Sequence, residues 1–288
     1  GEIQSFDPEE TLALTLRKPQ EYRDNSAHLF RWLSRRWLYN IPKSLLTEGL
    51  RPLGRLALVD NSRRTLQRIR LALANAIDSE AIARTCELTG PPFRSDAVRV
   101  YLVASVSGGT GSGMSLDLGY WLRALLARMG VSEASISGLF LHSTGREQRY
   151  RDLAKVNAHA WLAEYNHFLR PDGFYPGDES SGLPPFEPGQ MAFDHAYFVE
   201  LGNALEESEL TEAAESVAEM MYLETLTPAQ QFFDQCRETT RSANSPAASL
   251  RTFGLHRSST LSKQNLNLLA DELSYRIILG LKQANSSR

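Results

Sequence analysis

One stretch, residues 98–114, constrains this chain more than any other. It opens with the apolar run VRVYLVASV, which is rich in β-branched residues and is typical of a buried strand in a parallel sheet. The run ends in SGGTGSG, residues 107–113, and the apolar positions that follow from Met114 recur at helical spacing. The sequence therefore predicts a strand, a glycine-rich loop and a helix in direct succession.

A glycine loop at the amino end of a helix is suited to binding an anion. Glycine lets the backbone come close to a ligand, and the free amides and positive dipole end of the helix attract negative charge. A phosphate chain is the expected ligand, and a glycine-rich turn with a purely structural role is the alternative. The Thr110 and Ser112 hydroxyls would add hydrogen-bond donors to the backbone amides. The predicted phosphate-binding residues are Ser107, Gly108, Gly109, Thr110, Gly111, Ser112 and Gly113.

Two common phosphate motifs do not fit this loop. The P-loop requires a lysine after its glycines, and the dinucleotide motif GxGxxG would need its third glycine where Met114 or Leu116 stands. The loop instead resembles, at every position, the signature of the tubulin and FtsZ superfamily, and most closely that of the divergent bacterial tubulin-like family. The resemblance implies a bound guanine nucleotide, GTP or GDP, accompanied by Mg2+.

Strands and helices alternate along the rest of the chain. This alternation predicts an α/β fold whose mainly parallel sheet is flanked by helices, like the tubulin/FtsZ nucleotide-binding domain. We divide the chain into a polar, partly helical segment, residues 1–44, and a tubulin-like nucleotide-binding domain with a closing helix, residues 45–288. Further strands are predicted at 135–143, 193–201 and 250–256, and helices at 29–38, 56–77, 114–129, 146–169, 205–226, 228–236 and 261–283.

The resemblance implies further nucleotide contacts, each with an ordinary alternative. Glu147 and Arg151 have the spacing of a pair that lies near the ribose in FtsZ, and an i, i+4 ion pair on a helix is the other reading. Asn203 resembles an asparagine that contacts the guanine, but a loop asparagine can equally serve its own turn. If Gly109 lies against the phosphates, Gly109→Val should abolish binding and leave the fold largely intact.

The sequence also departs from the family. The opening strand and first glycine loop of the family are not recognisable here, so the chain is expected to begin after them, and the second domain of tubulins is expected to be missing or reduced. FtsZ carries an acidic loop that enters the site of the next subunit and assists water attack, whereas residues 239–250 contain no acid. Weak or absent GTP hydrolysis is therefore expected.

Tubulin-like domains associate head to tail, so the expected partners are further copies of this chain or other subunits of a bacterial complex. In such a contact Arg237 and Arg241 could approach the phosphates of a neighbouring subunit; a solvated loop is the alternative.

Composition excludes several other classes of protein. The 288 residues carry a formal net charge of -3, which argues against a general nucleic-acid binder, and no apolar run reaches the ~18 residues of a membrane span. Cys86 and Cys236 are too few and too far apart for a metal site, and no histidine spacing fits zinc. A cytoplasmic protein with reduced thiols is expected.

Three functions remain open at this point. The first is a guanine-nucleotide-binding, tubulin-like protein that self-assembles into oligomers or filaments, with its status as a GTPase undecided. The second is a non-hydrolysing tubulin-like scaffold or interaction module of a larger bacterial complex. The third is an enzyme that uses the glycine loop for a phosphorylated small molecule, and its activity would persist without guanine nucleotides.

Overall fold

The strands form one parallel sheet. The computed structural model describes residues 11–23, 26–89, 98–131, 133–239, 250–255, 267–268 and 270–276. The sheet has the strand order β1, β2, β3 and β4, with bounds Arg99–Ser105, Ser135–Gly145, His195–Leu205 and Leu250–Arg251. The predicted α/β fold with a parallel sheet is confirmed, although β4 ends at Arg251 and does not extend over residues 252–255.

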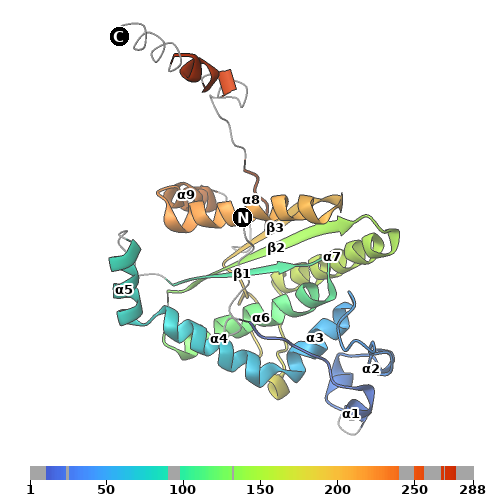
Figure 1. Cartoon of the computed structure of the whole chain (residues 1–288). Helices are drawn as coiled ribbons and strands as arrows, with labels where there is room; N and C mark the ends of the chain where they lie inside the picture. The colour runs from blue at the N-terminus through green and yellow to red at the C-terminus, as the bar shows by residue number, and fades with distance from the viewer. Residues whose placement is uncertain are drawn as a thin grey trace, which may run out of the picture. The chain divides into compact units, whose positions relative to one another are not determined.

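Helices cover both faces of the sheet (Figure 1). On one face lie α6 (Gly109–Arg128) and α7 (Gln148–Leu169), and on the other lies α8 (Glu207–Leu226), which is followed by α9 (Gln230–Thr239). Side chains of the strands alternate between these faces, and Phe140 of β2 packs on Trp161 of α7 with ring centroids 4.1 Å apart. Each face of the sheet thus buries apolar surface against a helix, as parallel sheets require.

Several predicted helices are divided in the structure. Residues 56–77 form two helices, α3 (Arg51–Asp60) and α4 (Ser62–Ala76), because the chain bends at Asn61, whose side chain donates to the carbonyl of Ala57 at 2.8 Å. Residues 29–38 are likewise split at Ser34, which has the extended ψ of 140° and precedes a short second helix. The remaining helices are α1 (Pro19–Arg23), α2 (Arg35–Tyr39), α5 (Ser79–Thr89) and two 3-10 turns, Leu29–Arg31 and Glu179–Ser181.

The glycine-rich loop is shorter than predicted, because α6 begins at Gly109 and not near Met114. The first turn of α6 lies directly against α3, with backbone touching backbone. A Cβ atom at Gly54 would lie 2.1 Å from the carbonyl oxygen of Gly109, and one at Gly113 would lie 2.3 Å from that of Arg51. Glycine is therefore required here for the close crossing of two helices.

Polar contacts hold the same crossing together. The Arg51 Nε donates to the carbonyl of Ser112 at 2.9 Å, and the Arg55 Nε lies 2.9 Å from Asp117 Oδ2. The Tyr175 hydroxyl also bonds to Asp117, whose pKa is raised by burial against the opposing charge of Arg55. A buried carboxylate needs such partners, so this cluster fixes α3 on α6 as well as satisfying the charge.

The N-terminal segment shares the core of the sheet and its helices. Its residues Leu16, Tyr22, Leu29, Leu33, Leu38 and Ile41 are all buried in that core. The proline-rich segment before β3, residues 171–189, forms a hairpin through the bridge between Tyr175 and Phe186. The Tyr175 ring stacks on that of Tyr120, with the ring centroids 3.7 Å apart. Residues 254–288 form a separate unit, in which residues 267–268 and 270–276 are helical.

The crossing of α3 and α6 generates a first prediction. Gly113→Ala should destabilise the protein by at least about 1 kcal/mol, because its methyl group would overlap the Arg51 carbonyl and outweigh the better helix propensity of alanine. Gly145→Ala is the control, since a Cβ at Gly145 meets no atom within 4 Å. Urea denaturation of both variants tests this, and equal stability would contradict the packing described.

Candidate functional site

The ends of β1, β2 and β3 meet at one edge of the sheet, where hydroxyl groups connect them. The Ser107 hydroxyl, just after β1, accepts the amide proton of Ser143 at 2.9 Å and lies 3.0 Å from His142 Nδ1, both on β2. The buried Thr144 hydroxyl accepts the amide proton of Ala204 at 2.9 Å on β3. Loops that follow these strands are therefore held in fixed relation to one another.

At Gly108 this edge of the sheet is open to solvent. It is the N-cap of α6, with φ −92° and ψ 167°, and a Cβ placed on it would meet no atom within 4 Å. The amides of the first helical turn have no partner within the helix, and the dipole of α6 adds positive potential at this end. Thr110 is exposed beside them, with its hydroxyl 3.2 Å from that of Thr47. An anion can reach these groups from solvent.

Three other residues of the predicted phosphate-binding loop pack inside the protein and have a structural role. Gly111 lies against β1, where a Cβ would be 2.1 Å from the Ser105 carbonyl oxygen, and Gly109 lies against Leu50, whose backbone nitrogen would be 2.6 Å away. Ser112 is buried, and its hydroxyl donates to the Gly108 carbonyl at 2.5 Å. The expectation that Gly109→Val leaves the fold intact is therefore wrong, because the side chain would displace the loop before α3.

Asn157 is a site residue that the sequence analysis missed. From the buried face of α7 its Nδ2 donates to the carbonyl of Gly49 at 2.8 Å and to that of Ser107 at 2.9 Å. One amide group thus ties the loop before α3 to the loop before α6. The signal was an asparagine among the apolar positions Ala154, Ala158 and Trp161 of a predicted helix, because a polar residue on a buried face needs partners.

Glu147 and Arg151 lie at the same edge, at the start of α7. Glu147 is the N-cap of the helix, and its side chain makes no capping bond. Arg151 donates through Nη2 to the carbonyl of Arg146 at 2.5 Å, and within the described residues it forms no ion pair with Glu147. Both residues thus follow directly after β2, and the alternative of a simple i, i+4 ion pair between them is not observed in the described residues.

Asn203 is exposed at the end of β3 and is oriented by β2. Its Oδ1 accepts from the Thr144 hydroxyl at 3.2 Å, which directs the amide NH₂ group away from that contact. The backbone on both sides is unusual, with φ +140° at Gly202 and +56° at Ala204. A left-handed alanine costs about 1–2 kcal/mol, so the surrounding structure holds Asn203 in a strained turn.

Arg237 lies at the opposite edge of the sheet, where the strands begin, and its side chain is not where the sequence analysis expected it. Arg237 is only 6% exposed and forms ion pairs with Glu224 and with Asp234, the latter at 3.1 Å. The prediction that Arg237 reaches the phosphates of a neighbouring subunit is therefore wrong, because these carboxylates hold it inside the protein. Arg241 and the rest of the acid-free loop, residues 240–249, lie outside the described residues.

The comparison with protein families agrees with this architecture. The model of the family described as "Tubulin like" matches residues 2–278. The chain belongs to the tubulin-like family. Searches of curated proteins and of solved structures found no match. Among the residues that the structure describes, no helix of this tubulin-like protein combines the length and apolar character of a membrane span.

A nucleotide can be tested against the residues of this edge. The open space at Gly108 and the unpaired amides of α6 suit a phosphate group, and the exposed Asn203 suits a base. Within the described part of the chain, no three histidine, cysteine or acidic residues cluster as metal ligands. Mg2+ usually takes most of its ligands from phosphates and water, so a nucleotide would supply what the protein does not.

Asn157 provides the prediction for this site. Asn157→Leu should cost about 1–3 kcal/mol, because the carbonyl groups of Gly49 and Ser107 lose their donor, and Asn157→Asp should cost at least about 2 kcal/mol, because a carboxylate would face both carbonyls. The control is Asn75→Asp, which makes the same change on the exposed surface of α4, where no buried contact is lost. Thermal unfolding measures the stability of the three variants. An equal loss of stability in Asn157→Asp and Asn75→Asp would contradict the proposed role of Asn157 in joining the two loops.

Proposed function

We propose that this tubulin-like protein binds a guanine nucleotide at the edge where β1, β2 and β3 end. The observation that carries the proposal is the open space in front of Gly108, next to the free amides at the start of α6. Ligands of open parallel sheets bind in this position, outside the carboxyl ends of the strands. The α- and β-phosphates would lie on Gly108, Gly109 and Thr110, within reach of backbone amides and one exposed hydroxyl.

The same edge offers contacts for the remaining parts of a nucleotide. Glu147 and Arg151 would contact the ribose, and the amide group of Asn203, whose Oδ1 is taken by Thr144, would donate to an acceptor on the guanine ring. Their positions on neighbouring strand ends support the assignment, because one ligand can span the phosphates, ribose and base only along such an edge.

We further propose head-to-tail self-association of the nucleotide-bound protein, with weak or absent hydrolysis. Hydrolysis requires a group that activates water, and the sequence 240–249, in the region where FtsZ carries its acidic loop, supplies no carboxylate for that task. Cys86 and Cys236 form no disulfide, which suits a reducing compartment such as the cytoplasm.

One observation favours a second function. Gly109, Gly111 and Gly113 are all required by packing, so this part of the motif would persist in a protein that binds no nucleotide. The second candidate is therefore a non-hydrolysing scaffold that keeps the tubulin-like fold and contacts other subunits of a complex.

Gly108→Asp separates these candidates. An aspartate at the N-cap accepts from the free amides of α6, so stability should rise by about 0.5–1 kcal/mol, while the affinity for GDP should fall at least about tenfold because the carboxylate occupies and repels the phosphate site. Calorimetric titration with GDP measures the affinity, and urea denaturation measures the stability. Gly108→Ala adds a methyl group without charge to the space proposed for the phosphates, so it should weaken GDP binding less than Gly108→Asp does.

Unchanged GDP affinity in the more stable Gly108→Asp variant would contradict the proposed site. Absence of any GDP binding by the unmodified protein would favour the scaffold. A preference for ADP over GDP would contradict the role assigned to Asn203.

Turnover and assembly form a separate prediction. Release of phosphate from GTP should stay far below the ~1 s⁻¹ of typical enzymes, because the sequence 240–249 contains no acidic residue that could activate water. Added GTP should raise the sedimentation coefficient through a heterologous contact that propagates from copy to copy. A monomer in the presence and absence of GTP, at tens of micromolar protein, would contradict self-association.

A further inference from the structure

Two outer helices of the protein each carry charges of one sign only. Helix α4 has four arginines and no acidic residue, whereas α8 has six glutamates and no basic residue. The chain as a whole has a formal net charge of only -3, so opposite charges are separated in space within it. Neither helix contributes a residue to the nucleotide site proposed above.

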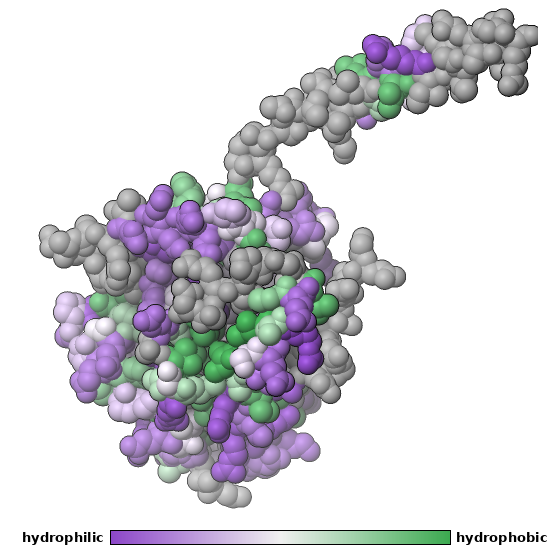
Figure 2. All heavy atoms as spheres, turned by 90° about the vertical axis from the view of Figure 1, so that its left-hand side faces the viewer, coloured by the Kyte–Doolittle hydropathy of each residue, from purple (hydrophilic) through white to green (hydrophobic). Residues whose placement is uncertain are grey.

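The two charged helices lie on opposite sides of the sheet (Figure 1). Helix α8 packs on β3, whereas α4 packs on α3 and α6, outside the helices that cover the other face of the sheet. Figure 2 shows hydrophilic side chains gathered towards the top and towards the bottom of the protein, with hydrophobic side chains exposed between them. The protein therefore presents a basic surface on one side and an acidic surface on the opposite side.

The exposed face of α4 combines three arginines with one apolar side chain. Arg63, Arg64 and Arg70 are exposed, and none of them forms an ion pair with another described residue. Leu71 lies on the same face of the helix and is 53% exposed. Neighbouring charges of one sign repel each other, so an acidic partner that covers this face would relieve the repulsion.

The exposed face of α8 has the complementary composition. Glu212 and Glu215 are exposed and form no ion pair within the described part of the chain, and Tyr222 lies on the same face and is 56% exposed. At about 1.5 Å per residue, Glu212 to Tyr222 spans roughly 15 Å and Arg63 to Leu71 spans roughly 12 Å. The two faces thus agree in length, and each places an exposed apolar side chain beside its charges.

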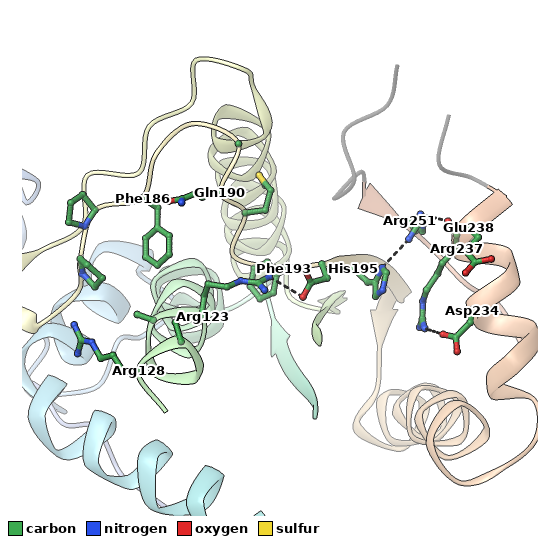
Figure 3. A pocket seen from close by; sticks show the side chains of 17 residues that line it. Arg123, Arg128, Phe186, Gln190, Phe193, His195, Asp234, Arg237, Glu238 and Arg251 are labelled. Carbon is green, nitrogen blue, oxygen red and sulfur yellow. Dashed lines mark hydrogen bonds and ion pairs between the residues drawn. The ribbon is translucent and has the colours of Figure 1, made fainter. Parts of the chain in front are cut away.

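Arginines near α8 do not neutralise its exposed face, because they are directed into the protein. Arg237 of α9 is 6% exposed and pairs with Asp234 at 3.1 Å (Figure 3), and it also pairs with Glu224 on the buried side of α8. Arg251 of β4 contacts His195 of β3, with 3.4 Å between Nη1 and Nδ1 (Figure 3). The outer side of α8 therefore stays acidic.

We propose that the α4 face of one copy of this chain binds the α8 face of a second copy, without any need for a nucleotide. A second copy is the partner because one chain carries both complementary surfaces. The contact is heterologous, so each pair keeps one free basic face and one free acidic face, and the association continues from copy to copy. It differs from the association proposed above, which depends on bound GTP.

Sedimentation of the nucleotide-free chain at different salt concentrations tests this contact. At an ionic strength of about 0.05 M, the sedimentation coefficient should rise with protein concentration up to about 100 µM. In about 0.5 M salt it should stay at the value of the monomer, because salt screens ion pairs on exposed surfaces.

Reversal of the charges on either face should weaken the association at least about fivefold, because like charges then meet. One variant combines Arg63→Glu with Arg70→Glu, and the other combines Glu212→Arg with Glu215→Arg. The chain with all four substitutions has the unchanged net charge of -3 and exchanges the charges between the two faces, so it should associate again. Recovery in this chain would show that the two faces meet each other.

Two controls separate the contact from other causes of association. Arg149→Glu with Lys155→Glu makes the same change of net charge on the exposed surface of α7, and should leave the association unchanged. Gly108→Asp should also leave it unchanged, because that variant affects only the nucleotide edge. The proposal is overturned by a monomer at low salt and about 100 µM protein, by equal weakening in the α7 control, or by no recovery in the chain with exchanged charges.

Discussion

The structure depends on one contact, the crossing of α3 over the first turn of α6. At this crossing Gly54, Gly109 and Gly113 bring two helix backbones together at distances that no side chain would allow. The ion pair of Arg55 with Asp117 and the bond from Arg51 to the Ser112 carbonyl then hold the helices in place. Because α6 starts directly after β1, fixing α6 also fixes the loop that ends the strand. A change that separates α3 from α6 would therefore act on the core and on the candidate site together.

The same contact fixes the start of α6, where we propose that the nucleotide binds. Asn157 joins the loops that precede α3 and α6, and the Ser107 and Thr144 hydroxyls join the ends of three strands. Next to these fixed points Gly108 faces open space. The protein thus pre-orders the amides of α6 before any ligand arrives, which reduces the entropy that binding has to overcome. Membership of the tubulin-like family agrees with this arrangement and leaves the nucleotide itself to experiment.

The sequence predicted the parallel α/β fold well, because the apolar runs of β1, β2 and β3 and the helices between them have clear periodicity. It could not predict which glycine faces open space and which glycines pack against the segment around α3, because Gly108 and Gly109 are the same residue type and differ only in their neighbours. It likewise missed Asn157, whose partners are distant in the chain, and it misplaced Arg237, whose buried partner Glu224 lies on another helix. The partners of such long-range polar contacts cannot be read from the local sequence, whereas Glu147, Arg151 and Asn203 could be placed at one edge because parallel strands end together.

The central claim is that the amides in front of α6 bind the phosphates of a guanine nucleotide. It is tested most directly by following the backbone amide resonances of the ¹⁵N-labelled protein by NMR while GDP is added. The resonances of the Gly108, Gly109 and Thr110 amides are expected to shift first and most, followed by those near Asn203, while those of Arg123 and Arg128 stay in place. Shifts confined to the other edge of the sheet, or no shifts at millimolar GDP, would contradict it.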